Sequence, residues 1–123
     1  DCYSVEPDEF NDTKNSLEKN KIISVVPGSK SICDALLAPQ PGDITFYINR
    51  KILKKGITVS DKEVKKTINI IAENLKLVVE PGGAVAVAAL LNNKLEIKNK
   101  TIIVMISGGN IDNKFFSEII KNN

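Results

Sequence analysis

The chain has 123 residues, of which 42% are hydrophobic and 26% charged, and its net charge is +2. This length suffices for one small domain with a hydrophobic core, and the composition is that of an ordinary globular protein. A small, scattered positive charge argues against nucleic-acid binding, the absence of histidine excludes a histidine-based catalytic or zinc site in this chain, and no apolar stretch is long enough to span a membrane.

The two cysteines, Cys2 and Cys33, do not have the spacing of metal ligands. No signal peptide opens the sequence, so we expect a cytoplasmic protein with reduced thiols. The chain also begins without methionine, and residues 3–5 have the pattern of a strand whose beginning is missing. We therefore expect a fragment, or a domain cut from a longer chain.

An acidic cluster follows this first strand, which is predicted to end at Pro7 because proline cannot donate to a sheet. Asp12 is predicted to cap a helix over residues 13–19. Two interpretations remain open at this point. The cluster is either a solvated turn with a helix cap, or a site where carboxylate and carbonyl oxygens bind Mg²⁺ or Ca²⁺.

Two further helices are predicted before the middle of the chain. Residues 31–37 are expected to form a short helix, in which Asp34 is either exposed or paired. Residues 43–55 are ambiguous, because residues 45–48 favour a strand by propensity. We expect a helix there, on the helical spacing of three isoleucines, Ile44, Ile48 and Ile52.

The next segment carries the clearest local signals. After a short strand over residues 57–59, Ser60 and Glu63 have the spacing of a capping box. The helix that follows is predicted to run to residue 79 and to be amphipathic. Its apolar stripe consists of Val64, Ile68, Ile71 and Leu75. We expect this face to cover a sheet.

Residues 84–91 are predicted to form a helix that is apolar all round and therefore buried on every side. Glu80 lies just before it, where the helix dipole favours a carboxylate. The residue is present either for that reason alone or for a function. A last helix is predicted over residues 113–121, capped by Asp112 and packing through four apolar side chains, Phe115, Phe116, Ile119 and Ile120.

Residues 101–106 are mostly β-branched and apolar, which predicts a strand buried on both faces. Parallel α/β sheets bind ligands at the carboxyl ends of their strands. The sequence SGGN at residues 107–110 therefore lies where a ligand is expected, and its two glycines allow close approach. A Gly-Gly turn with a purely structural role would have the same sequence.

Seven motifs occur in an order that resembles a known family. They are VEP (5–7), SLE (16–18), SICDALL (31–37), PGDITF (41–46), VSDKE (59–63), EPGGA (80–84) and SGGNID (107–112). The chain resembles the C-terminal part of threonine/serine dehydratases, which share a family with serine racemase. The resemblance implies an α/β fold of the tryptophan synthase β-like type (fold type II), with a mostly parallel sheet flanked by helices. Residues 1–123 would be the C-terminal part of the large cofactor-binding domain.

The resemblance implies pyridoxal 5′-phosphate as cofactor. Ser107 corresponds to the serine that hydrogen-bonds the pyridine nitrogen, and this neutral partner suits β-elimination, since it leaves the ring less electron-withdrawing. Gly108 and Gly109 would line the ring, Glu80 would lie close to it, and Asp34 would lie on the substrate side as a catalytic residue.

The resemblance also implies a divalent cation, Mg²⁺ or Ca²⁺, bound by the carboxylates of Glu6 and Asp12 and the backbone carbonyl of Phe10. Two family features are missing from the chain. These are the Schiff-base lysine in its Ser-x-Lys-x-Arg-Gly motif and the glycine-rich phosphate loop, both of the family's N-terminal part. We therefore expect the 123-residue chain to be inactive alone.

Three functions remain as hypotheses. The first is a lyase that converts the small-molecule substrates L-threonine or L-serine to a 2-oxo acid and ammonia. The second is a serine racemase or a related amino-acid lyase of the same family, and the third is a non-catalytic α/β binding module. By analogy with the family, the full-length enzyme would be a dimer or tetramer.

Overall fold

The computed structural model describes residues 1–121, and at its centre are two parallel strands. Strand β1 (Cys2–Pro7) pairs with β2 (Leu53–Val59), with Val5 opposite Ile57 and Pro7 opposite Val59. The strand predicted at residues 57–59 is therefore present but begins earlier. Because the strands are parallel, their carboxyl ends lie at the same edge of the sheet, and β1 ends at Pro7 as predicted.

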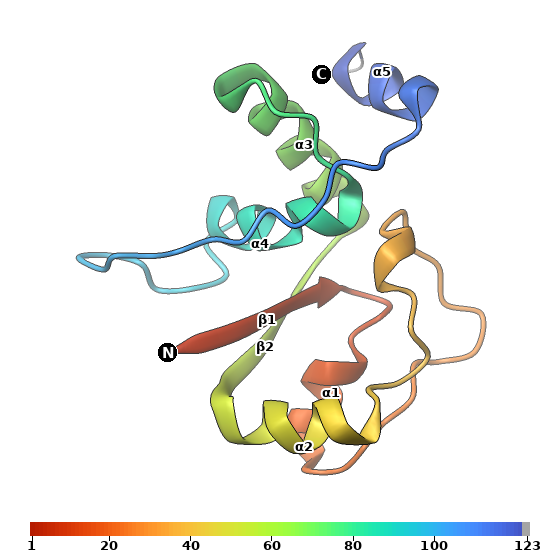
Figure 1. Cartoon of the computed structure of the whole chain (residues 1–123), viewed down its shortest axis with the longest axis vertical. Coiled ribbons are helices and arrows are strands. Elements are labelled where there is room, and N and C mark those ends of the chain that lie inside the picture. Colours follow the sequence, from red (N-terminus) through yellow and green to blue (C-terminus); the bar gives the residue numbers. More distant parts are fainter. Residues whose placement is uncertain (122–123) are drawn as a thin grey trace.

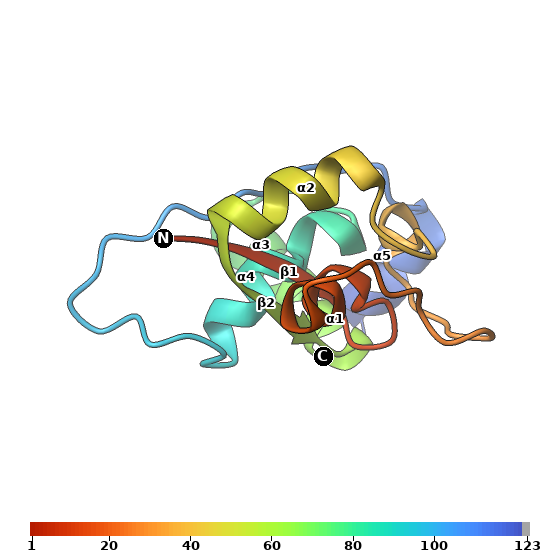
Figure 2. The same cartoon turned by 90° about the horizontal axis from the view of Figure 1, so that it is seen from below.

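Helices cover both faces of this sheet (Figures 1 and 2). Helices α1 (Asp12–Lys19) and α2 (Asp43–Ile52) lie on one side. On the other side, α4 (Pro81–Leu91) packs on both strands, α3 (Asp61–Leu75) packs on α4, and α5 (Asn113–Lys121) packs on α3. A 3₁₀ helix, η1 (Asp34–Leu36), precedes α2. The α/β fold with a parallel sheet flanked by helices is confirmed.

The main hydrophobic core lies between the sheet and the α3–α4 pair. Val59 of β2 is fully buried there, together with Val64, Ile68 and Ile71 of the predicted stripe. The stripe ends sooner than predicted, since Leu75 is exposed. Helix α3 also ends at Leu75, because Lys76 adopts a left-handed conformation with φ 56°. No glycine marks this end, so the sequence carried no usual stop signal there.

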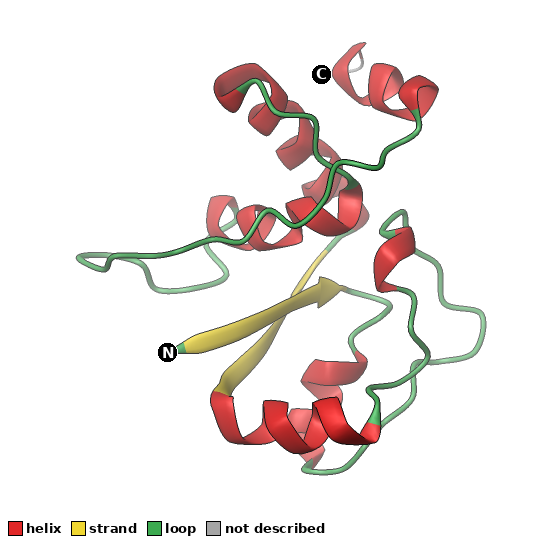
Figure 3. Ribbon diagram, in the orientation of Figure 1, coloured by secondary structure: helices red, strands yellow, loops and turns green. Residues whose placement is uncertain are grey.

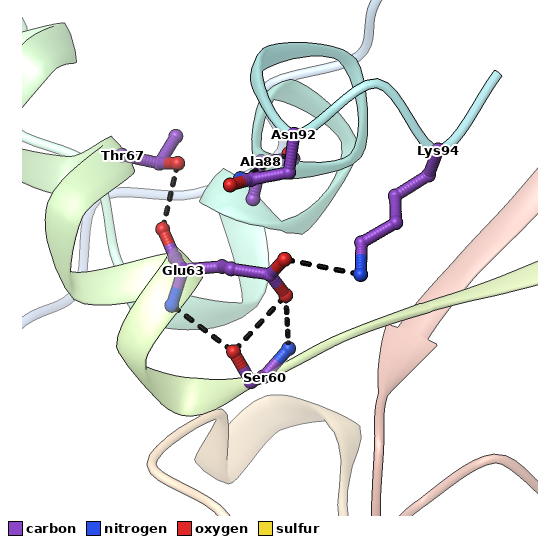
Figure 4. A network of polar contacts seen from close by, with 6 residues as sticks. All are labelled: Ser60, Glu63, Thr67, Ala88, Asn92 and Lys94. Carbon is purple, nitrogen blue, oxygen red and sulfur yellow. Dashed lines mark hydrogen bonds and ion pairs between the residues drawn. The ribbon is translucent and has the colours of Figure 1, made fainter.

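The capping box at the start of α3 is confirmed. The Ser60 Oγ accepts a hydrogen bond from the Glu63 N–H, and the Ser60 N–H donates to Glu63 Oε2 at 2.7 Å. Lys94, just beyond α4, forms an ion pair of 3.0 Å with the other carboxylate oxygen of Glu63 (Figure 4). Burial would raise the pKa of Glu63, but the contacts with Ser60 and Lys94 outweigh it and lower that pKa.

Replacing Ser60 by Ala should therefore destabilise the fold without changing its topology. The loss of a helix cap typically costs about 1 kcal/mol, because an amide of the first helical turn loses its partner. The measurement is the midpoint of chemical denaturation of the full-length protein. Lys62→Ala is the control, since Lys62 is exposed in the same turn, and an equal midpoint for both variants would contradict the prediction.

Four other boundaries differ from the predictions. Residues 31–37 form only the single 3₁₀ turn η1, and the helix predicted at 43–55 ends at Ile52, where the chain enters β2. Asn11, not Asp12, is the N-cap of α1, and Asp12 is the first helical residue. Helix α4 begins at Pro81 and is not buried on every side, because Leu91 is exposed. The last helix, α5, has the predicted bounds, and Asp112 caps it by accepting the Phe115 N–H at 2.8 Å.

The buried strand predicted at residues 101–106 is wrong for this structure. The segment is extended chain without strand pairing (Figure 3), and Ile103 and Met105 are 92% and 71% exposed. A strand requires a neighbour to accept its backbone hydrogen bonds. Among residues 1–121, only β1 and β2 pair, so this apolar segment has no neighbouring strand with which to form a sheet.

The helices within residues 1–121 are all too short or too polar to span a membrane.

Candidate functional site

The SGGN turn lies against the segment that leads into α4. The Glu80 N–H donates to the Gly108 carbonyl oxygen at 3.0 Å, and the Asn110 N–H donates to Glu80 Oε2, also at 3.0 Å. In Figure 1 the chain that precedes α5 crosses α4 here. The structure thus brings together Glu80 and the SGGN turn, which are about 30 residues apart along the chain.

Glycines allow these two segments to approach each other. A Cβ atom at Gly83 would lie 2.9 Å from the Gly108 carbonyl oxygen. A Cβ atom at Gly109 would lie 2.9 Å from the Val78 carbonyl oxygen. A Cβ at Gly108 would lie 2.5 Å from Glu80 Cδ. The first two contacts are with backbone, which cannot rotate away. These glycines therefore have a packing role, in addition to any contact with a ligand.

Asp34 reaches the same end of α4 through the packing of η1. A Cβ at Gly82, in the first turn of α4, would lie 3.4 Å from Leu36 Cγ and 3.5 Å from Ala35 Cβ. Asp34 itself is exposed, and its Oδ1 accepts the Ala35 N–H at 3.0 Å. Ser107 is also exposed, whereas Glu80 is half-buried. Two exposed polar side chains therefore flank the beginning of one buried, glycine-containing helix.

The second group of predicted site residues lies at the carboxyl end of β1. Glu6 and Asp12 are only 9% and 6% exposed, and Phe10, which lies between them in sequence, is also buried. The Glu6 carboxylate accepts the Thr13 N–H at 2.8 Å and the Lys14 N–H at 2.9 Å. It therefore satisfies two amides at the start of α1, a role that the sequence analysis did not predict.

The negative charges of Glu6 and Asp12 repel each other. Burial, and then the negative charge of Glu6, raise the pKa of Asp12 to about 6. No group of three or more His, Cys, Asp and Glu side chains within residues 1–121 has the arrangement of a metal site. Any cation here would depend on two carboxylates and on carbonyl oxygens, which is a ligand set that suits Mg²⁺ or Ca²⁺.

A close contact between β2 and α1, near Glu6 and Asp12, was not predicted from the sequence. A Cβ at Gly56 of β2 would lie 2.6 Å from both Cα and Cβ of Lys14 in α1. Gly56 therefore sets how closely α1 can approach the sheet, and with it the position of the amides that Glu6 binds. A glycine inside a strand often marks such an approach, and this was the signal available in the sequence.

Comparison with known protein families identifies the class of protein to which this fold and these two groups of residues belong. Residues 1–108 match the family described as pyridoxal-phosphate dependent enzymes. The chain belongs to this family, which confirms the resemblance drawn from its motifs and the expectation of pyridoxal phosphate as cofactor.

Several individual proteins of known activity are similar to this chain. The chain is 39% identical to an L-threonine ammonia-lyase of Thermotoga maritima, over 77% of this chain and 23% of the relative. It is 37% identical to a serine racemase of Schizosaccharomyces pombe, over 91% of this chain and 34% of the relative. Among solved structures, a threonine deaminase of T.th. superposes with a TM-score of 0.82 at 31% identity, over 89% of this chain and 40% of that one. The chain thus spans between about a quarter and two fifths of the length of these relatives.

Proposed function

We propose that this chain forms one wall of the active site of a pyridoxal-phosphate-dependent threonine/serine dehydratase. The reaction would convert L-threonine to 2-oxobutanoate, or L-serine to pyruvate, with release of ammonia. The observation that carries the proposal is the contact between Glu80 and the SGGN turn in a chain of this family. Residues 1–123 would be the C-terminal part of the large cofactor-binding domain.

The residues at this wall fit one edge of the cofactor. When bound, pyridoxal phosphate supplies an electron sink for bonds that break at the α-carbon of an amino acid. The exposed hydroxyl of Ser107 can hydrogen-bond the pyridine nitrogen without adding a charge. Gly108 and Gly109 carry no side chain that would obstruct the ring. Glu80 holds this turn in place through the Asn110 N–H.

Asp34 would act on the substrate side, as a carboxylate that binds or orients the amino acid. Two observations support this role: Asp34 is exposed and so accessible to a small molecule, and its neighbours Ala35 and Leu36 lie near Gly82 in the first turn of α4. The lysine that holds the cofactor in the family has no counterpart motif in these residues. In our proposal, this chain therefore orients the cofactor and does not bind it covalently.

Replacing Ser107 by Ala in the full-length enzyme should reduce turnover of L-threonine about tenfold, as expected for one lost hydrogen bond of about 1.4 kcal/mol. The thermal midpoint should not change, because Ser107 is exposed. The loss of turnover is measured by steady-state kinetics at a saturating concentration of the cofactor. The control is Ser24→Ala, because Ser24 lies on an exposed loop. Unchanged turnover would refute the role of Ser107.

We also infer that Glu6, Asp12 and the carbonyl of Phe10 bind a divalent cation, Mg²⁺ or Ca²⁺. The support is the burial of two carboxylates, one of which has a pKa raised by burial and by the other. A cation would offset this repulsion and order the loop between β1 and α1. Millimolar Mg²⁺ or Ca²⁺ should then raise the thermal midpoint of the full-length protein, and Asp12→Asn should abolish the increase. A midpoint independent of both ions would contradict the site.

Serine racemase is the second candidate, because relatives of that name match over most of this chain. Chiral analysis of serine after incubation with the enzyme separates the two: D-serine would indicate racemisation and pyruvate would indicate elimination. We further propose a cytoplasmic dimer or tetramer. Sedimentation of the full-length protein tests the oligomeric state.

A further inference from the structure

Asp61, the first residue of α3, joins that helix to the loop that carries Asp34. Its Oδ1 accepts the Ser31 hydroxyl at 2.7 Å, and its Oδ2 accepts the Ile32 N–H at 3.1 Å. Asp61 is about 30 positions from both partners in sequence, so the contact closes a long loop. One carboxylate thus holds a side chain and a backbone amide of the same segment.

The hydrogen-bonded chain continues from Ser31 toward η1. The Ser31 Oγ accepts the Cys33 N–H at 3.1 Å, and the Cys33 carbonyl accepts the Leu36 N–H at 2.8 Å. Cys33 is fully buried in the core, and burial raises the pKa of its thiol to about 11, so the side chain is a neutral packing group. The segment before Asp34 is therefore fixed twice, by Asp61 and by Cys33.

The other side of η1 rests on α4. If Gly82 carried a Cβ atom, the side chains of Ala35 and Leu36 would lie at ordinary van der Waals distance from it. Asp34 is therefore placed between two fixed points, the Asp61 carboxylate at the start of α3 and the first turn of α4. The hydrogen bonds of Asp61 therefore hold the loop that leads into Asp34.

We propose that Asp61 is a positioning residue that sets the place of Asp34 on the substrate side of the site, an inference that rests on the proposed function. An aspartate suits this role for two reasons. Both of its oxygens accept hydrogen bonds, whereas an amide could accept at only one atom. It also lies in the first turn of a helix, where the dipole stabilises a negative charge.

The test uses the full-length enzyme with pyridoxal phosphate bound, and four variants. Asp61→Ala and Ser31→Ala each remove one side of the contact, the double variant removes both, and Ser31→Thr keeps the hydroxyl. The matched control is Ser60→Ala, which removes the cap of the same helix but neither of the hydrogen bonds of Asp61 to Ser31 and Ile32. The readouts are kcat and KM for L-threonine and L-serine, and the visible absorbance of the bound cofactor.

We expect Asp61→Ala and Ser31→Ala to raise KM about tenfold, the effect of about 1.4 kcal/mol on binding. Cofactor absorbance should stay at the wild-type level, since neither residue contacts the cofactor wall. The effect of the double variant should be smaller than the sum of the two single effects, because both single variants remove the Asp61–Ser31 hydrogen bond. Ser31→Thr should restore the wild-type KM, and Ser60→Ala should lower stability with KM unchanged.

A wild-type KM in Ser31→Ala would overturn the inference, even if Asp61→Ala did not fold. So would an equal rise of KM in Ser60→Ala, since the effect would then follow from general destabilisation of α3. If the wild-type enzyme binds the cofactor but turns over neither amino acid, the proposed function fails, and this inference fails with it. The wild-type assay therefore separates the two failures.

Discussion

Replacing Gly83 by Ala is expected to disrupt the candidate site, although helix propensity alone predicts the opposite. Ala is favoured over Gly inside a helix by about 1 kcal/mol. At Gly83, however, the new methyl group would lie 2.9 Å and 3.0 Å from backbone atoms of Gly108. Backbone cannot rotate away, so α4 and the SGGN turn must separate. Overpacking of this kind typically costs about 1–3 kcal/mol.

Gly82→Ala is the matched control, because Gly82 lies in the same turn of α4 but meets only side-chain atoms at 3.4 Å or more. The measurements are the thermal midpoint of the full-length protein and its affinity for pyridoxal phosphate by absorbance titration. We expect Gly83→Ala to lower both, and Gly82→Ala to leave cofactor affinity unchanged. Equal behaviour of the two variants would show that the close approach of the two segments is unimportant.

Replacing Gly56 by Ala should have the second large effect. The added Cβ would lie 2.6 Å from Cα and Cβ of Lys14, so α1 must move away from β2. This movement would also displace the Thr13 and Lys14 amides that Glu6 binds. We expect a loss of roughly 2 kcal/mol or more in the free energy of unfolding, from overpacking and lost hydrogen bonds.

Lys55→Ala is the control for Gly56→Ala, because Lys55 is exposed in the same strand. The measurement is chemical denaturation of the full-length protein with and without Mg²⁺ or Ca²⁺. In Gly56→Ala, any stabilisation by the cation should also be reduced, since the loop between β1 and α1 shifts. A free energy of unfolding equal to that of Lys55→Ala would contradict the close packing of α1 on β2.

Elements defined by local signals could be predicted from the sequence. The capping box of Ser60 and Glu63 fixed the start of α3, and Asp112 fixed the start of α5. Both depend on hydrogen bonds between residues three positions apart, so that no distant part of the chain is needed.

Elements that depend on distant partners could not be predicted in the same way. Residues 101–106 have strand propensity, but among residues 1–121 no neighbouring strand pairs with them. The strand propensity of residues 45–48 was outweighed by helical periodicity, yet the same periodicity did not show that α2 stops at Ile52. Propensity describes what a segment can form, whereas pairing depends on the rest of the fold.

In the candidate site too, local motifs could be predicted from the sequence, whereas contacts between distant residues could not. Its individual motifs were visible in sequence, and the family resemblance assigned them to one site. The geometry was not visible, since the contacts of Glu80 with Asn110 and of Asp61 with Ser31 each join residues about 30 positions apart. The dual role of Glu6, as a candidate cation ligand and as a partner of the first amides of α1, also required the structure.

The most direct test of the central claim is the turnover of L-threonine by the full-length protein that carries this chain, supplied with pyridoxal phosphate. We expect the protein to bind the cofactor, with a visible absorbance band, and to release 2-oxobutanoate and ammonia in equal amounts. L-serine should give pyruvate in the same assay. A folded full-length protein that neither binds pyridoxal phosphate nor releases a 2-oxo acid would contradict the claim.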